Sequence, residues 1–380
     1  MRGWGDQSAS LTGVTDSHPP RPACLEAILL VGGQGTRLRP LTLRTPKPLL
    51  STAGVPFLAH QLARARAFGV RRIVFATSYR AEMFAEVFGD GSEFGLSLEY
   101  MTERTPLGTG GAIRNAAEAL TCAPEAPVLV LNGDILSGHD IGAQVRLHVE
   151  RQAAVTLHLT EVDDPSRFGC VPTGDDGRVT AFLEKTPNPV TNRINAGCYV
   201  FQRAAIDRIP ADRVVSVERE TFPGMIESGD LVMGYPDRTY WLDVGTPAAF
   251  VQGSCDLVLG RLDSPALPGP TGEFLCLPGA EISADAKLSG GTVAGARATV
   301  MSDSTVHGSV LGEDCVIESG VGIHDSVVGA GARVCSGAVL KNAVIGDNAV
   351  IGADNELLSG VRIWPGVQLP ACSVRFSSEI

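Results

Sequence analysis

The chain has 380 residues, of which 44% are hydrophobic and 19% are charged, a composition typical of a globular protein with two or three domains and a large core. It contains no run of about twenty apolar residues, so the sequence predicts no membrane-spanning segment. The net charge of −11 disfavours general binding to nucleic acids, and an anionic substrate must therefore be met by local positive charge and by metal.

The segment 1–23 is polar, contains three prolines and lacks the apolar stretch of a secretory signal, so we expect it to form a disordered extension. Nine cysteines, an odd number, are scattered along the chain without a Cys-x-x-Cys spacing. Cys170 and Cys198 lie in apolar runs, where cysteine behaves as a small hydrophobic residue. These features predict reduced thiols and a cytoplasmic location.

The most informative segment is a glycine-rich loop that follows an apolar run at 27–31. Three of its residues are Gly32, Gly33 and Gly35, and Arg37 and Lys47 come shortly after. Glycines allow several backbone N–H groups to point at one anion, an arginine can fork onto phosphoryl oxygens, and a lysine adds a mobile charge.

Two common phosphate-binding motifs do not fit this loop. The dinucleotide fingerprint requires a third glycine where Leu38 stands, and a Walker loop requires Gly-Lys-Ser/Thr. An ordinary turn with solvated basic side chains is the remaining alternative. Prolines on both sides of Lys47 hold it in an extended backbone and favour an inward direction, so the loop predicts a polyphosphate site.

The segments 29–42 and 45–50 resemble the signature of the sugar-1-phosphate nucleotidyltransferases, which make nucleotide sugars. The resemblance extends over nearly the whole chain from Ala27 onward. It implies that Arg37 and Lys47 take part in catalysis, and that the nucleotide is bound by Gly32, Gly33, Gly35, Thr36 and Arg37.

Between about residues 25 and 250, apolar β-rich runs alternate with helix-like stretches. We expect strands at 72–77, 98–101, 128–131 and 155–159, and helices at 56–68, 81–88, 109–120 and 141–150. This alternation predicts an α/β fold with a mostly parallel sheet covered on both faces, and ligands at the carboxyl ends of the strands. The resemblance implies a Rossmann-like nucleotidyltransferase domain, which we assign to residues 24–260.

Two aspartates follow strand-like segments and are candidate ligands of Mg²⁺. Asp134 follows an apolar strand, and Asp243 lies between a β-like segment and a helix start. Magnesium in proteins typically uses one or two carboxylates together with substrate phosphates and water. Either aspartate alone is more commonly a turn or capping residue, but both match the positions where the resemblance implies metal ligands and catalytic residues.

A second glycine cluster, at 106–112, is a candidate site for the nucleotide base. It precedes an expected helix, where free N–H groups could bond O6 of a purine, and Gly108 and Thr109 are the residues we assign to the nucleotide. Capping of the helix by Thr109 is an alternative role that is compatible with this one. Glu103 is a further, unassigned acidic residue nearby.

The resemblance implies a pocket for a sugar phosphate in the middle of the chain. Glu184 would accept bonds from sugar hydroxyls and Lys185 would meet the phosphate. Asn195 lies just before an expected strand, and Gly169 would allow the sugar to approach the backbone closely. Without the resemblance, Glu184 and Lys185 would be an ordinary surface pair.

Several motifs are similar to those of bacterial mannose-1-phosphate guanylyltransferases: 107–111, 184–186, 194–199, 216–220, 358–360 and 364–366. This similarity implies GTP and α-D-mannose 1-phosphate as substrates, with Mg²⁺. Specificity for glucose 1-phosphate or another sugar phosphate, or for another base, remains open because one hydroxyl orientation separates mannose from glucose. A hexapeptide acyltransferase using His307 or His324, and an inactive regulatory subunit, are the alternatives from other classes.

A linker rich in proline and glycine at 264–272 separates two kinds of sequence, and we place the linker at 261–275 and a further domain at 276–380. In that domain apolar residues recur every six positions, which is the signature of a hexapeptide parallel β-helix of about five coils, left-handed by the resemblance. One phase contains Ile345, Ile351, Leu357, Ile363 and Leu369; the other contains Val316, Val328, Val334 and Leu340, with Gly322 in the missing place.

Phase slips near Ser309 and Lys341 are expected corners or insertions, and a Gly-rich β-sandwich is the alternative fold. We expect the β-helix to support a homo-oligomer.

Overall fold

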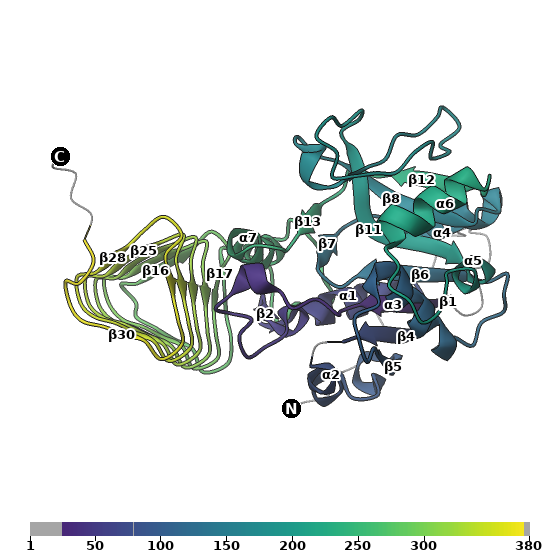
Figure 1. Ribbon diagram of the computed structural model, residues 1–380. Helices are drawn as coiled ribbons and strands as arrows, with labels where there is room; N and C mark the ends of the chain where they lie inside the picture. The colour runs from purple at the N-terminus through teal and green to yellow at the C-terminus, as the bar shows by residue number, and fades with distance from the viewer. Residues whose placement is uncertain (1–24, 79, 376–380) are drawn as a thin grey trace, which may run out of the picture. The chain divides into compact units, whose positions relative to one another are not determined.

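A computed structural model describes residues 25–78 and 80–375 (Figure 1). The expected disordered extension at 1–23 lies outside the described residues. The chain forms two compact units, and neither is a continuous stretch. Among the described residues, the first unit comprises 25–32 together with Leu62–Gly133 and His139–Thr239, and the second comprises Gly33–Gln61, Asp134–Gly138 and 240–375.

The first unit is built on one nine-stranded sheet. Its central order is β10-β9-β11-β6-β1-β4-β5, and β8 and β12 extend it from β11. The pairs β6–β1, β1–β4 and β4–β5 are parallel, whereas β11 runs antiparallel to β6 and β8. The strands are β1 (Leu25–Leu30), β4 (Val70–Thr77), β5 (Ser97–Thr102), β6 (Pro127–Asn132), β8 (Val155–Glu161), β9 (Gly169–Cys170), β10 (Leu183–Glu184), β11 (Arg193–Gln202) and β12 (Val232–Pro236).

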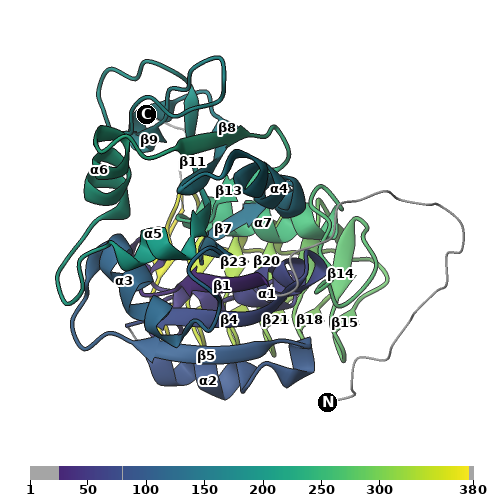
Figure 2. The same cartoon turned by 90° about the vertical axis from the view of Figure 1, so that its right-hand side faces the viewer.

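Helices cover this sheet on both faces. Successive side chains of β4 point to opposite faces, and on one face Phe75 packs edge-on against Phe84 of α2 (Ala81–Phe88). On the other face Val74 belongs to the same core as Ile113 of α3 (Gly108–Ala116). Figure 2 shows α2 beside β5.

The helices match the expected positions closely. The expected helix at 109–120 is divided into α3 and a short 3₁₀ turn, η4. The helices and turns are α1 (Phe57–Ala67), which continues from the second unit into the first, α2 (Ala81–Phe88), η3 (Ser92–Phe94), α3 (Gly108–Ala116), η4 (Ala117–Ala119), α4 (Ile141–Arg151), η5 (Pro165–Arg167), α5 (Arg203–Asp207), the π-helix η6 (Val217–Thr221) and α6 (Phe222–Glu227). In the described part of the chain, none of the helices has the length and apolar character needed to cross a membrane.

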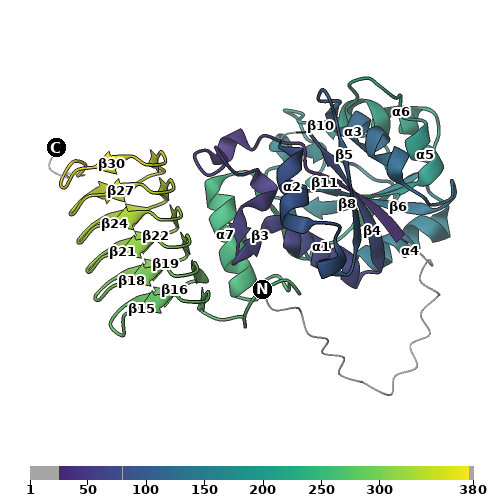
Figure 3. The same ribbon diagram turned by 90° about the horizontal axis from the view of Figure 1, so that it is seen from below.

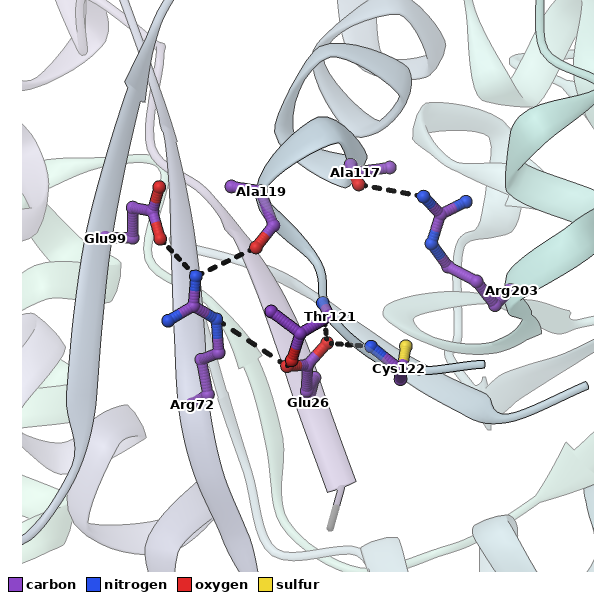
Figure 4. A network of polar contacts seen from close by, with 8 residues as sticks. All are labelled: Glu26, Arg72, Glu99, Ala117, Ala119, Thr121, Cys122 and Arg203. Carbon is purple, nitrogen blue, oxygen red and sulfur yellow. Dashed lines mark hydrogen bonds and ion pairs between the residues drawn. The ribbon is translucent and has the colours of Figure 1, made fainter. Parts of the chain in front are cut away.

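A buried carboxylate fixes the amino-terminal end of β1 (Figure 4). Glu26 is 1% exposed and accepts hydrogen bonds from the backbone N of Thr121 at 2.9 Å and of Cys122 at 3.1 Å. Nε of Arg72 lies 3.6 Å from the same carboxylate and its Nη2 donates to the carbonyl of Ala119. Burial raises the pKa of Glu26, but the hydrogen bonds from Thr121 and Cys122 outweigh it and leave the pKa below its ordinary value. This network stabilises the fold and is not part of the candidate site.

The second unit begins with the glycine-rich loop and includes a two-stranded ribbon. Its elements before the β-helix are η1 (Thr36–Leu38), η2 (Lys47–Leu49), β2 (Ser51–Thr52), β3 (Val55–Pro56), β7 (Ile135–Ser137), β13 (Trp241–Asp243) and α7 (Pro247–Val258). The side chain of Thr246 caps α7 by accepting from the N of Ala249, and Pro247 occupies the first turn, where its missing N–H costs nothing.

The rest of the second unit is a parallel β-helix, as predicted (Figure 3). Its three sheets contain six, six and five strands, and every pairing within them is parallel. The first sheet is β14 (Phe274–Cys276), β17 (Thr292–Ala294), β20 (Val310–Leu311), β23 (Val327–Val328), β26 (Val344–Ile345) and β29 (Arg362–Ile363). The second is β15 (Glu281–Ile282), β18 (Thr299–Val300), β21 (Val316–Ile317), β24 (Arg333–Val334), β27 (Val350–Ile351) and β30 (Gln368–Leu369), and the third is β16 (Lys287–Ser289), β19 (Thr305–His307), β22 (Gly322–His324), β25 (Val339–Lys341) and β28 (Glu356–Leu357).

The side chains that fill the β-helix correct one detail of the sequence prediction. The residues of the six-residue pattern from Val328 to Leu357 are buried in one core, but Ile317 and Ile323 fill the interior instead of Val316 and Gly322. At three of the corners between the third and first sheets, successive inward residues are five positions apart, as in Val306 to Leu311, and at the first and last of these corners they are six apart. The phase slips near Ser309 and Lys341 therefore lie at corners, and the prediction was wrong by one residue for Val316 and Gly322 because it assumed a constant step of six.

Candidate active site

Lys47 and Asp134 form an ion pair in the second unit. Nζ of Lys47 lies 3.0 Å from Oδ2 of Asp134, and the Lys47 side chain is only 10% exposed. Pro46 and Pro48 flank Lys47 at the start of η2, so the inward direction predicted from the prolines is confirmed. A nearly buried ammonium requires an opposite charge, and Asp134 supplies it.

Arg37 and Asp243 meet around Gly245. The position that a Cβ atom on Gly245 would occupy lies 2.7 Å from Nη2 of Arg37 and 3.1 Å from Oδ1 of Asp243. A Cβ atom at 245 would therefore make the guanidinium at the end of the Arg37 side chain shift from this position. No role for Gly245 was predicted from the sequence, in which its Asp-x-Gly spacing from Asp243 was the available signal.

The backbone of the phosphate loop is held by local hydrogen bonds. Gly35 precedes η1 with φ of 60°, a left-handed conformation that favours glycine, and its carbonyl accepts from the N of Leu38 and from Oγ1 of Thr42. A Cβ atom on Gly35 would lie 3.0 Å from Cβ of Lys47. Space around a Cβ of Gly33 is open, which leaves its backbone accessible to a ligand.

The ribbon of β7 and β13 brings the two candidate metal ligands together. Asp243 pairs with Ile135 in the antiparallel register, and the N of Val244 donates to the carbonyl of Asp134 at 3.0 Å. The described residues contain no group of three or more His, Cys, Asp or Glu that could hold a metal. Two carboxylates on neighbouring positions fit Mg²⁺, which takes its remaining ligands from phosphate and water. We refer to Arg37, Lys47, Asp134 and Asp243 as the charged cluster.

In the first unit, the side chain of Thr109 is engaged by the protein itself. Its Oγ1 donates to Oε2 of Glu218 at 2.7 Å and accepts from the N of Val217 at 2.9 Å. Oγ of Ser216 donates to the same Glu218 oxygen, so this network ties the start of α3 to η6. The motif at 216–220 is similar to a motif of the family, but no role was predicted for it from the sequence. The structure shows that it holds the start of α3 through these hydrogen bonds.

The expectation of free amides at the second glycine cluster needs correction. The N of Gly110 and of Gly111 both donate to the carbonyl of Val215, at 2.8 and 3.3 Å. Gly108 and Thr109 come first in α3, where a helix supplies no intrahelical acceptor for the amides. Burial raises the pKa of Glu103, whose carboxylate accepts from the N of Leu107 just before the helix.

Three of the four candidate sugar-phosphate residues lie together on the hairpin of β9 and β10. Gly169 pairs with Glu184, and a Cβ atom on Gly169 would lie 2.9 Å from Oε2 of Glu184. Nζ of Lys185 lies 3.4 Å from Oε1 of Glu184, and the lysine side chain is 61% exposed. An exposed ammonium beside a mostly buried carboxylate offers both a cation and acceptors to one ligand.

Asn195, the fourth residue, lies on the adjacent strand β11, which contacts β9 through Ile194 and Cys170. Its side chain donates to the hydroxyl of Tyr199 at 2.9 Å and accepts from the N of Gly197 at 3.2 Å. The pairing of β11 with β8 is interrupted between Asn195 and Tyr199, and these hydrogen bonds hold the irregular segment.

Comparison with known proteins identifies both parts of the chain. The family model described as "Nucleotidyl transferase" matches residues 26–258, and that described as "GlmU-like, C-terminal hexapeptide" matches residues 278–359. A protein of Mycobacterium tuberculosis named "Mannose-1-phosphate guanylyltransferase" is 52% identical over 94% of this chain and 99% of its own length. A Drosophila melanogaster protein named "Mannose-1-phosphate guanylyltransferase catalytic subunit beta" is 39% identical over 67% of this chain and 70% of its own.

Solved structures agree with this assignment. HddC from Yersinia pseudotuberculosis, for which one of two solved structures is a complex with GMP-PN, is 26% identical with a TM-score of 0.52, over 60% of this chain and 98% of its own. Nucleotidyltransferases of this family generally use a divalent metal ion. The protein described here belongs to the nucleotidyl transferase family and is an enzyme, and its catalytic domain is followed by a hexapeptide-repeat β-helix.

Proposed function

We propose that this enzyme transfers a guanylyl group from GTP to α-D-mannose 1-phosphate, giving GDP-mannose and pyrophosphate. The name and the 52% identity of the Mycobacterium tuberculosis relative support this substrate pair. The complex of HddC with GMP-PN supports a guanine nucleotide.

The arrangement of Arg37 and Asp243 about Gly245 is the observation on which the chemistry depends. In the reaction an oxygen of the sugar phosphate attacks the α-phosphorus of GTP, a new P–O bond forms, and the bond to the β-phosphate breaks to release pyrophosphate. The guanidinium of Arg37 stabilises negative charge that develops on the α-phosphate and the leaving group. Gly32, Gly33, Gly35 and Thr36 present backbone N–H groups to the triphosphate.

Lys47 has two tasks in this proposal. Its ion pair with Asp134 keeps that carboxylate at a fixed position, and its ammonium adds positive charge beside the triphosphate. Asp134 and Asp243 would hold the Mg²⁺, which when bound neutralises phosphate charge and aligns the reacting groups. Asp134 directly precedes β7 and Asp243 is the last residue of β13, so the antiparallel ribbon brings the two residues to the same end.

The residues of the β9–β10 hairpin bind the sugar phosphate. The exposed ammonium of Lys185 meets its phosphate, while the carboxylate of Glu184 accepts bonds from two hydroxyls. Asn195 and the backbone of Gly169 complete the contact with the sugar, and Gly108 and Thr109 contact the base through their amides. We propose these roles together because the residues assigned to each ligand already lie close to one another within their own unit.

The substrates are tested with a panel of four nucleoside triphosphates against mannose 1-phosphate and glucose 1-phosphate, with released pyrophosphate as the readout. The proposal expects the highest kcat/KM with GTP and mannose 1-phosphate, and dependence on added Mg²⁺. Turnover with glucose 1-phosphate alone would replace the mannose assignment with a glucose-1-phosphate nucleotidyltransferase, the nearest alternative.

We also propose that the enzyme works in the cytoplasm as a homo-oligomer that assembles through its β-helix. In this proposal residues 24–260 form the catalytic domain and residues 276–380 form the β-helix domain. All eight cysteines among the described residues are free, which fits a reducing compartment. The first and second sheets end at β29 and β30, and a terminal strand can offer backbone groups to another chain. Light scattering of the full chain and of a β-helix surface variant measures the oligomeric state.

A further inference from the structure

A residue of the last β-helix coil holds the phosphate loop. Nη1 of Arg362, on β29, donates to the carbonyl of Arg37 at 2.9 Å and to the carbonyl of Arg39 at 2.7 Å. Both acceptors belong to η1 or its carboxyl-terminal cap, and all three residues lie in the second unit. One guanidinium nitrogen therefore uses both of its hydrogens on the turn that contains Arg37.

The remaining carbonyls of this turn are used within the loop. The carbonyl of Thr36 accepts from the N of Arg39, and that of Leu38 accepts from the N of Leu41. Among the described residues, the carbonyls of Arg37 and Arg39 have Arg362 as their hydrogen-bond partner. The loop thus supplies its own internal bonds, and the β-helix supplies the bonds to the other two carbonyls.

The position of Arg362 in the β-helix also sets it apart. Arg362 aligns along the first sheet with four valines, Val293, Val310, Val327 and Val344, and with Leu275 at the start of the row; all five are nearly buried although they do not belong to the β-helix interior. These valines form an outer apolar row, and an arginine takes the corresponding place in the last coil. A charged residue at one position of an otherwise apolar row indicates that its side chain has a specific polar partner.

The corner before Arg362 differs from the three corners of this kind that precede it. Inward residues across those three corners are five positions apart, from Leu340 to Ile345 for example, but Leu357 and Ile363 in the last coil, like Leu288 and Ala294 in the first, are six apart. Ser359 and Gly360, which form this longer corner, both have positive φ. The extra residue lies directly before the strand that bears Arg362.

We propose that Arg362 is a positioning residue for catalysis, and that it sets the place of the Arg37 guanidinium by fixing the backbone of η1. The Arg37 side chain extends from this turn to Gly245 and Asp243, so a shift of the backbone moves the guanidinium from the α-phosphate. The inference rests on the proposed function. It gives the β-helix a direct part in the transferase reaction.

The test compares Arg362→Met, which keeps the apolar stem and removes the donors, with Arg362→Lys and with Arg333→Met. Arg333 is an exposed arginine of β24 that pairs with Glu318 and serves as the matched control. Arg362→Met should lower kcat about tenfold and leave the KM for the sugar phosphate unchanged, because misplacing a catalytic group by a fraction of an ångström affects the transition state more than binding. Arg362→Lys should restore part of kcat, and Arg333→Met should match the wild type.

Hydrogen exchange of the full-length protein supplies a second readout that does not depend on turnover. The amides of Leu38, Arg39 and Leu41 should exchange faster in Arg362→Met than in Arg333→Met. Wild-type kcat in the Arg362→Met protein, or equal exchange at these amides, overturns the inference. A wild type without guanylyltransferase activity refutes the proposed function instead, and faster exchange in the variant would still support the structural role of Arg362.

Discussion

The guanidinium of Arg37 and the carboxylate of Asp243 both come within about 3 Å of the position that a Cβ atom of Gly245 would occupy. The residues are far apart in the sequence and come from a 3₁₀ turn and a β-ribbon. Substitution Gly245→Ala should therefore displace Arg37 and lower kcat about tenfold or more. Steady-state kinetics and the melting temperature Tm check this.

The control for Gly245→Ala is Gly224→Ala, because a Cβ atom there meets nothing within 4 Å. Gly224 lies in α6, where alanine is the better helix former, so this variant should keep full activity and a Tm at least equal to that of the wild type. Unchanged kcat in Gly245→Ala would contradict the assigned role of Arg37.

Replacement of Asp134 or Asp243 by asparagine should raise the Mg²⁺ concentration needed for half-maximal activity. An amide keeps the shape of the side chain but loses the charge that a hard divalent cation prefers. Initial rates over a Mg²⁺ titration measure the shift, which we expect to be about tenfold. Asp285→Asn, an exposed aspartate of the β-helix, serves as the control, and a titration curve for Asp134→Asn that overlays this control would exclude Asp134 as a ligand.

Lys185→Ala should raise the KM for mannose 1-phosphate about tenfold or more, because a charge-assisted contact with the phosphate is lost. The KM for GTP should change little. Lys287→Ala removes an exposed lysine of the β-helix and should leave both constants unchanged. A defect of Lys185→Ala confined to GTP would place this lysine on the nucleotide instead.

Four buried histidines make the stability of the protein sensitive to acid. Burial lowers the pKa of His148 to about 4 and that of His158 to about 3, and it also lowers the pKa of His60 and of His139, whose ring stacks on His158 at 3.7 Å. Below pH 6.5 the unfolded chain binds protons at these residues and the folded protein does not. Their contribution to stability is therefore complete above about pH 7 and is lost as the pH falls toward about 4.

Urea unfolding at pH 7.5 and pH 5.0 measures this effect. Each histidine should contribute about 2 kcal/mol to the loss of unfolding free energy at the lower pH. The variant His148→Gln should lose less stability between the two pH values than the wild type does. An equal loss in both proteins would show that His148 is accessible to protons in the folded state.

Local patterns in the sequence were sufficient for most of the fold. The strands at β4, β5, β6 and β8 and the helices α1, α2 and α4 agree with prediction because hydrophobic periodicity reports which face of an element is buried. The period of six likewise predicted the β-helix. Its phase was wrong at Val316 and Gly322 because Val316 and Ile317 are both apolar, and only the five-residue corners decide which of them points inward.

The sequence also determined the types of group at the site, since glycine loops, basic residues and aspartates after strands have recognisable local contexts. It did not determine their partners. That the amides of Gly110 and Gly111 are taken by Val215, that Gly245 makes room for Arg37, and that Arg362 holds the turn from the far end of the chain were decided only by tertiary structure. The reason is physical: hydrogen bonds and steric contacts depend on positions in space that residues distant in the chain reach only after the strands have paired and the coils have stacked.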